Sequence, residues 1–168
     1  GGLAAAERIV GDGKPSGKTV DRFAKSLDDY PSTYNFHESR DYVDYTDDIY
    51  VGYRYFETIP GAAEKVVYPF GYGLSYTTFD VETVSAGVVN SNCTSEANKL
   101  YAKVRVTNTG KFSGKEVVQV YIAKPQGKLG KPAKELAAFE KTRELQPGES
   151  QLMILTWKIN DMASYDDL

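Results

Sequence analysis

The segment Leu100-Tyr-Ala-Lys-Val-Arg-Val-Thr107 is the clearest indication of fold class in this sequence. Small or branched apolar residues (Ala102, Val104, Val106) alternate along it with polar residues such as Lys103. A period of two is typical of a strand with one buried and one solvated face. The turn Asn108-Thr-Gly110 follows at once. The segment therefore predicts one strand of an antiparallel sheet.

Four further segments have strand character and are separated by turn signals, which indicates an antiparallel β-sandwich. They are 79–89, 116–123, 134–143 and 151–159. In the last of them Trp157 alternates with Met153 and Leu155 in a way that predicts a core position. Because such a sandwich has about seven strands, we expect a truncated one that is incomplete at its C-terminus.

The first thirty residues have a different character from the sandwich. Residues 3–10 are good helix formers with one apolar face, and the turn Gly11-Asp-Gly-Lys-Pro-Ser-Gly17 ends the predicted helix. A helix this short needs a packing partner, and the residues that follow it contain few candidates for one. Residues 19–27 predict only a short extended segment.

Tyrosine is concentrated in one part of the chain. Ten of the thirteen tyrosines lie from Tyr30 to Tyr76, interleaved with acidic residues. Neither a helical nor a strand period is sustained there, which predicts an ordered but irregular segment. Within it, 49–56 is rich in β-favouring and aromatic residues and is the part expected to be most structured.

Composition excludes several function classes. Hydrophobic residues make up 41% and charged residues 26% of the 168 residues, as in ordinary globular proteins. No run approaches the roughly 18–20 apolar residues of a membrane-spanning helix, and a net charge of −3 gives no drive toward nucleic acid. We therefore expect neither a membrane nor a nucleic-acid partner.

Metal and cofactor chemistry also find little support. His37 is the single histidine, so a two-histidine metal site has no basis. Cys93 is the single cysteine, so neither an internal disulfide nor a zinc site built on several thiolates has one. We expect no cofactor and no metal. Asn92-Cys-Thr94 is formally a glycosylation sequon, which we expect to be unmodified.

The stretch Tyr68-Pro-Phe-Gly-Tyr-Gly-Leu-Ser-Tyr-Thr-Thr-Phe79 resembles a signature of family 3 glycoside hydrolases, the β-glucosidase group. Other segments agree with the family in the same order along the chain. They are 11–17, 45–56, 104–110 with 114–121, 134–141 and 145–150. The resemblance implies three parts: the tail of an α/β sandwich domain at 1–29, a tyrosine-rich connecting segment at 30–76, and a fibronectin type III-like β-sandwich at 77–168.

The resemblance also implies a function for the complete enzyme. The family is a retaining one, with a nucleophilic Asp on a (β/α)8 barrel and a Glu acid/base, a pair that must lie roughly 5–5.5 Å apart. Neither catalytic motif is found here, so no catalytic residue is assigned in this chain. We expect an accessory, structural region of a β-glucosidase-like enzyme that acts on a β-linked glucoside or oligosaccharide. Its partners would be the barrel and α/β domains of the same protein.

A contribution to the rim of a substrate site is the sharper hypothesis for the tyrosine-rich segment. Aromatic faces stack on sugar rings and carboxylates accept hydrogen bonds from hydroxyls, which makes Tyr45, Asp47, Asp48 and Tyr50 the candidates. The alternative is that these tyrosines are half-buried docking residues with apolar bodies inside. A second function class, a non-catalytic carbohydrate- or protein-binding module, fits the same composition.

Overall fold

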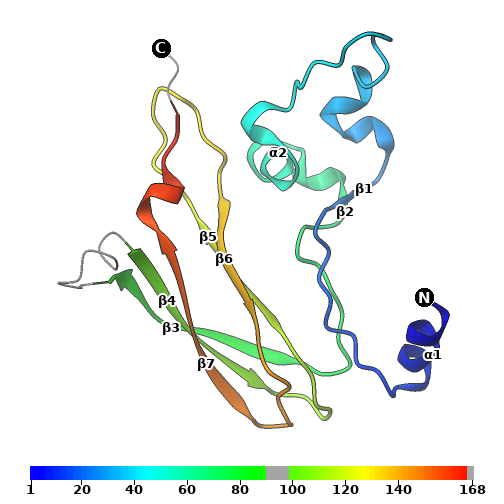
Figure 1. Ribbon diagram of the computed structural model, residues 1–168, viewed down its shortest axis with the longest axis vertical. Coiled ribbons are helices and arrows are strands. Elements are labelled where there is room, and N and C mark those ends of the chain that lie inside the picture. The colour runs from blue at the N-terminus through cyan, green and yellow to red at the C-terminus, as the bar shows by residue number, and fades with distance from the viewer. Residues whose placement is uncertain (90–98, 166–168) are drawn as a thin grey trace. The chain divides into compact units, whose positions relative to one another are not determined.

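The computed structural model describes residues 1–89 and 99–165 (Figure 1). The sequon at 92–94 lies outside the described residues. Contacts divide the chain into two compact units. The first comprises Gly1–Lys18, Gly73–Val120 and Leu136–Leu168, and the second comprises Thr19–Tyr72 and Tyr121–Glu135. The predicted division at residues 29 and 76 is drawn from the family resemblance and stays a prediction.

Five antiparallel strands form the sandwich, as the alternation predicts, and most of their residues belong to the first unit. One sheet has the order β3-β4-β7 and the other pairs β5 with β6 (Figure 1). Each strand begins and ends within two residues of its predicted range. The bounds are β3 Phe79–Val88, β4 Lys99–Asn108, β5 Val117–Ile122, β6 Glu135–Lys141 and β7 Ser150–Lys158.

The core of the sandwich is built from the inward positions of these strands. In the register of β4 and β7, Val104 faces Met153 and Ala102 faces Leu155. All four side chains are buried, and Trp157 packs against them, as predicted. Burying such side chains stabilises the fold by roughly 1.5–3 kcal/mol each for the larger ones. The alternation along the sequence is therefore the pattern of the core.

A buried amide closes one end of the sandwich. Asn108, the last residue of β4, is fully buried, and its side chain donates to the carbonyls of Phe112 at 2.7 Å and Leu145 at 2.8 Å. Its Oδ1 accepts from the Thr77 hydroxyl at 2.7 Å and from the Gly110 main chain at 3.0 Å. Every donor and acceptor of the amide is thus used. Because its partners lie in separate turns, Asn108 joins three turns of the chain.

The predicted N-terminal helix is present as α1 (Gly2–Val10). Gly11 ends it in the left-handed conformation, with φ of 85°, which glycine adopts without steric cost. No residue of α1 is buried, and Ile9 is 85% exposed. A short 3-10 helix (Ile159–Met162) follows β7 in the same unit. No helix in the described residues is long and apolar enough to cross a bilayer.

A pair of main-chain hydrogen bonds joins the two ends of Thr19–Tyr72, the longer segment of the second unit. Thr19 donates to the Tyr72 carbonyl at 2.8 Å, and its own carbonyl accepts from Gly71 at 2.8 Å. Beyond this neck, the short strands β1 (Phe23–Ala24) and β2 (Val66–Tyr68) pair antiparallel. The two ends of the segment are thus held by its own hydrogen bonds.

Helical turns occupy most of the second unit, including a segment of β-favouring composition. The segment 49–56, whose composition favours a β-strand, is structured but helical: it forms the end of a 3-10 helix (Asp48–Tyr50) and most of α2 (Tyr53–Thr58). Gly52, at φ 71°, separates the two, and the helical turn buries Phe56 while placing Tyr53 on the same face. Tertiary packing has overridden β-propensity. The other 3-10 helices are Leu27–Asp29, Pro31–Tyr34 and Ala63–Lys65.

Candidate functional site

The four candidate rim residues lie in and just before one 3-10 turn, and they differ widely in exposure. Tyr45 is 95% exposed, whereas Tyr50 and Asp47 are half-buried and Asp48 is exposed. The Tyr50 main chain donates to the Asp47 carbonyl at 2.9 Å, which closes the turn. The structure therefore brings Asp47, Asp48 and Tyr50 together and leaves Tyr45 in solvent.

Two features of this turn are unusual. Asp48 has φ of 48°, a left-handed conformation that is uncommon for residues other than glycine. One carboxylate oxygen of Asp47, Oδ1, is buried without a hydrogen-bond partner among the described residues. An acceptor held in this state suits a hydroxyl or amide donor.

The tyrosine-rich segment is an aromatic network in the second unit. Tyr53 stacks at a tilt on Phe70, with ring centroids 4.8 Å apart, and meets Tyr121 edge-on at 6.0 Å. Tyr30 and Phe56 are edge-on at 5.8 Å. These geometries are the preferred ones for aromatic pairs. Tyr50, Tyr53 and Tyr55 are half-buried, while Tyr68 is 45% exposed.

Ion pairs connect this network to the segment 121–135 of the same unit. Lys134 lies 3.0 Å from Glu57, and Arg54 lies 3.5 Å from Glu135, which also pairs with Lys124. Burial raises the pKa of the Tyr121 hydroxyl, and the neighbouring Tyr53 and Glu57 add to this effect. The unit is thus held by amphipathic rings and charges more than by aliphatic core.

Arg22 is a residue of this unit that sequence reasoning missed. It is only 4% exposed, and its guanidinium lies 4.8 Å from the centre of the Phe56 ring and 5.9 Å from that of Tyr53. Burial lowers the pKa of Arg22 from its ordinary value, although Asp21 and other neighbouring groups oppose the change. No local signal distinguishes this arginine from a surface one.

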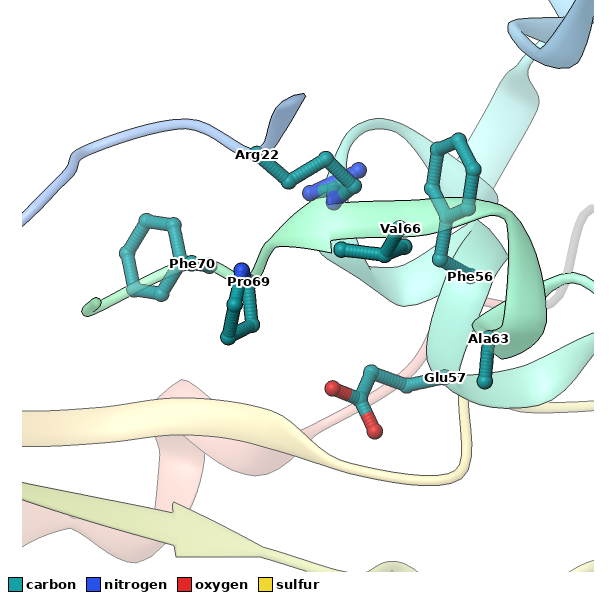
Figure 2. A pocket seen from close by; sticks show the side chains of 7 residues that line it. All are labelled: Arg22, Phe56, Glu57, Ala63, Val66, Pro69 and Phe70. Atoms are coloured by element: carbon teal, nitrogen blue, oxygen red, sulfur yellow. The ribbon is translucent and has the colours of Figure 1, made fainter. Parts of the chain in front are cut away.

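Arg22 lines a pocket of about 190 Å³ (Figure 2). Apolar side chains supply most of the lining, and Glu57 is the other charged group. The lining residues are Arg22, Phe56, Glu57, Ala63, Val66, Pro69 and Phe70. None of the four candidate rim residues borders it, so the pocket and the strained turn are separate features of the unit.

A second pocket, of about 300 Å³, lies in the sandwich unit and is polar. It is bordered by Arg8, Asp12, Lys14, Lys115 and Glu144, whose charges largely offset one another. Among residues 1–89 and 99–165, no three His, Cys, Asp or Glu side chains gather as a metal site would require.

Comparison with known proteins relates the whole chain to one group of enzymes. Residues 116–168 match the fibronectin type III-like domain. The chain is 60% identical over its full length to β-glucosidase A of Butyrivibrio fibrisolvens and covers 21% of that protein. The structure of a β-glucosidase from Paenibacillus barengoltzii aligns with a TM-score of 0.90 and 50% identity over 99% of this chain and 17% of that one. A GH3 β-glucosidase from Bifidobacterium adolescentis aligns with a TM-score of 0.86 and 34% identity over 99% of this chain and 23% of that one. The chain thus spans about a fifth of the length of these proteins.

Proposed function

Because this chain is homologous along its whole length to the part of family 3 β-glucosidases that holds their fibronectin type III-like domain, we propose that it is an accessory region of such an enzyme. In this role it supports the hydrolysis of a β-linked glucoside by the complete protein and does not perform the chemistry. The observation that carries the proposal is the 60% identity over the full chain to a fifth of a β-glucosidase.

The physical character of the second unit supports a bracing role. Its tyrosines have apolar bodies and polar hydroxyls, and both hydroxyl contacts of Tyr30 are internal: it accepts from the Ala24 main chain and donates to the Arg22 carbonyl, each at 3.0 Å. Such rings form rigid surfaces with little loss of side-chain entropy. The barrel and α/β domains of the same protein are the partners we propose for these surfaces.

The first test asks whether the chain has any activity alone. We expect no release of nitrophenol from p-nitrophenyl β-glucoside, because the two carboxylates of a retaining mechanism are not recognisable in it. Turnover that a single substitution such as Asp47→Asn abolishes would contradict the accessory role. Saturable binding of a soluble β-glucan to the isolated chain would instead favour a carbohydrate-binding module.

The second test places the chain in an enzyme. We expect β-glucosidase A of B. fibrisolvens to lose activity when its homologous segment is deleted and to regain it when this chain replaces the segment. Unchanged activity and thermal stability after deletion would contradict the proposal.

The same chimera tests the rim hypothesis for the strained turn. If Tyr45 contributes to a substrate rim, Tyr45→Ala should raise KM for oligosaccharides and leave Tm unchanged. Tyr165→Ala is a matched control, since Tyr165 is 88% exposed and Tyr45 95% exposed. Equal KM values for the two variants would show that Tyr45 does not contribute to a substrate rim.

A further inference from the structure

The side chain of Arg22 is buried, and its guanidinium has no hydrogen-bond acceptor in the described part of the chain. The main chain of Arg22 is satisfied: its N–H donates to Asp21 at 2.8 Å, and its carbonyl accepts from the Tyr30 hydroxyl at 3.0 Å. No described residue accepts from the guanidinium or forms an ion pair with it, although the side chain is 4% exposed. Its nitrogens are not among the fully buried polar atoms that lack a partner. They therefore reach the adjoining pocket, where water or an anion can compensate for the hydration that the rest of the side chain has lost.

The surroundings hold this guanidinium in one orientation. The guanidinium carbon lies 4.8 Å from the centre of the Phe56 ring, a cation–π contact that holds the group on one side. On another side the backbone approaches closely, since a Cβ on Gly52 would lie 3.4 Å from an Nη atom. A planar fork fixed in this way is prepared for a two-point contact with a planar anion.

The adjoining pocket limits what that anion can be. Val66, Pro69 and Phe70 supply apolar walls, and Figure 2 shows Val66 between Arg22 and Glu57 in that view, with Pro69 and Phe70 to one side. Glu57 is paired with Lys134 at 3.0 Å, whereas Arg22 forms no ion pair with a described residue. With about 190 Å³, the space equals roughly six water molecules. A small anion with an apolar body fits these walls better than a sugar or a dianionic phosphate.

We propose that this pocket binds a carboxylate, which Arg22 holds through two parallel N–H···O contacts while the carbon body of the ligand lies against the apolar walls. The carboxylate can belong to a small free acid or to an Asp or Glu side chain of a polypeptide. Both present the same planar group to the guanidinium. This site is independent of the accessory role proposed above, and either can fail without the other.

The test is a pair of NMR titrations of the 168-residue chain that follow the Arg22 Nε–Hε resonance. Benzoate represents a free acid and benzamide is its neutral counterpart; the capped peptide Ac-Ala-Glu-Ala-NH2 represents a side chain, with Ac-Ala-Gln-Ala-NH2 as its control. We expect at least one carboxylate to shift this resonance in a saturable way and to bind roughly tenfold or more tighter than its amide, because a charge-assisted pair replaces a neutral contact. Binding by benzoate alone identifies a small-acid site, and binding by the glutamate peptide alone identifies a side-chain site.

Two variants separate binding from folding. Glu57→Gln removes the one negative charge at the pocket and should tighten carboxylate binding by roughly threefold or more at low salt. Glu38→Gln, the same change at an exposed residue of the same unit, should leave it unchanged. Arg22→Gln should abolish the preference for carboxylate over amide, provided that its circular dichroism spectrum matches that of the parent chain.

Several results would overturn the proposal. One is that neither carboxylate binds better than its amide, which would leave water as the partner of Arg22. Another is that Glu57→Gln and Glu38→Gln change the affinity equally. A folded Arg22→Gln chain that still prefers the carboxylate would do the same.

Discussion

Replacing Asn108 by alanine should lower the free energy of unfolding of the sandwich by about 2–6 kcal/mol. Its fully buried amide makes four hydrogen bonds, to Thr77, Gly110, Phe112 and Leu145. A hydrogen bond contributes about 0.5–1.5 kcal/mol net, and the groups left unpaired are themselves buried or part-buried. Four such bonds give the stated range. The loss would be large against the 5–15 kcal/mol of a typical domain.

Urea denaturation followed by fluorescence of Trp157, the single tryptophan, measures this loss, because that residue packs against the sandwich core. The matched control is Asn160→Ala, the same change at an exposed residue, which we expect to cost less than about 0.5 kcal/mol. An Asn108→Ala chain within about 0.5 kcal/mol of that control, at an unchanged m-value, would refute the reasoning.

Asn108→Asp tests whether the two amide donors matter apart from packing. The carboxylate has nearly the same shape but directs an acceptor at the carbonyls of Phe112 and Leu145. Its pKa in the folded state should therefore rise above the ordinary value of about 3.9. A carboxyl group whose pKa is higher in the folded chain than in the unfolded chain destabilises the fold at pH values where the unfolded chain has ionised. The variant should accordingly lose stability relative to the parent chain as pH rises from about 4 to 6; a pH-independent difference would contradict this.

Three other changes have clear expected outcomes. Leu155→Ala, at a side chain 3% exposed, should cost about 2–5 kcal/mol by urea denaturation, while Leu152→Ala, at 53% exposure, should cost less than about 1 kcal/mol. Asp48→Gly should be neutral or stabilising by up to about 1 kcal/mol, because the φ of Asp48 is 48° and glycine adopts this left-handed conformation without strain. The control Asp41→Gly should destabilise the chain by about 0.5–1 kcal/mol. Equal shifts in Tm for the two variants would show that the turn at Asp48 is not strained. The pKa of Glu149 is lowered from 4.5 by hydrogen bonds from the Gln146 main chain and the Arg143 side chain, so its stabilisation is present above about pH 4.5 and is lost as pH falls through the lowered pKa. The urea midpoints of the parent chain and Glu149→Gln should converge below that pH, and a constant gap would contradict the assignment.

The strands could be predicted because their burial is a local property of the sequence. Once Val104 and Val106 alternate with charged residues, a strand with one inward face follows, and the register places Met153 opposite Val104. The role of Asn108 could not be predicted from the same stretch. As part of an Asn-Thr-Gly sequence it indicates only a turn, and its partner Leu145 lies far along the chain.

The second unit was harder to predict because its contacts are distant in sequence. The turn of α2 exists where Phe56 can pack on Arg22 and Tyr30, and nothing local favours it over a strand. For the same reason Arg22 carries no signal of its burial. The rim assignment of Asp47 rests on residue type alone and stays a prediction, although its unpaired Oδ1 is a structural reason to test it.

The hydrogen bonds between Thr19 and the segment 71–72 have a consequence for dynamics. Because both ends of the intervening segment are fixed at one neck, the segment can open and refold without unravelling β3, the strand that follows it. It should then behave as a separate cooperative unit, or foldon, in native-state hydrogen exchange. Amides of β1, β2 and α2 would share one opening free energy, distinct from the larger one common to β4 and β7. An extra stretch of chain inserted at a position such as Gly61 should lower the first and leave the second unchanged.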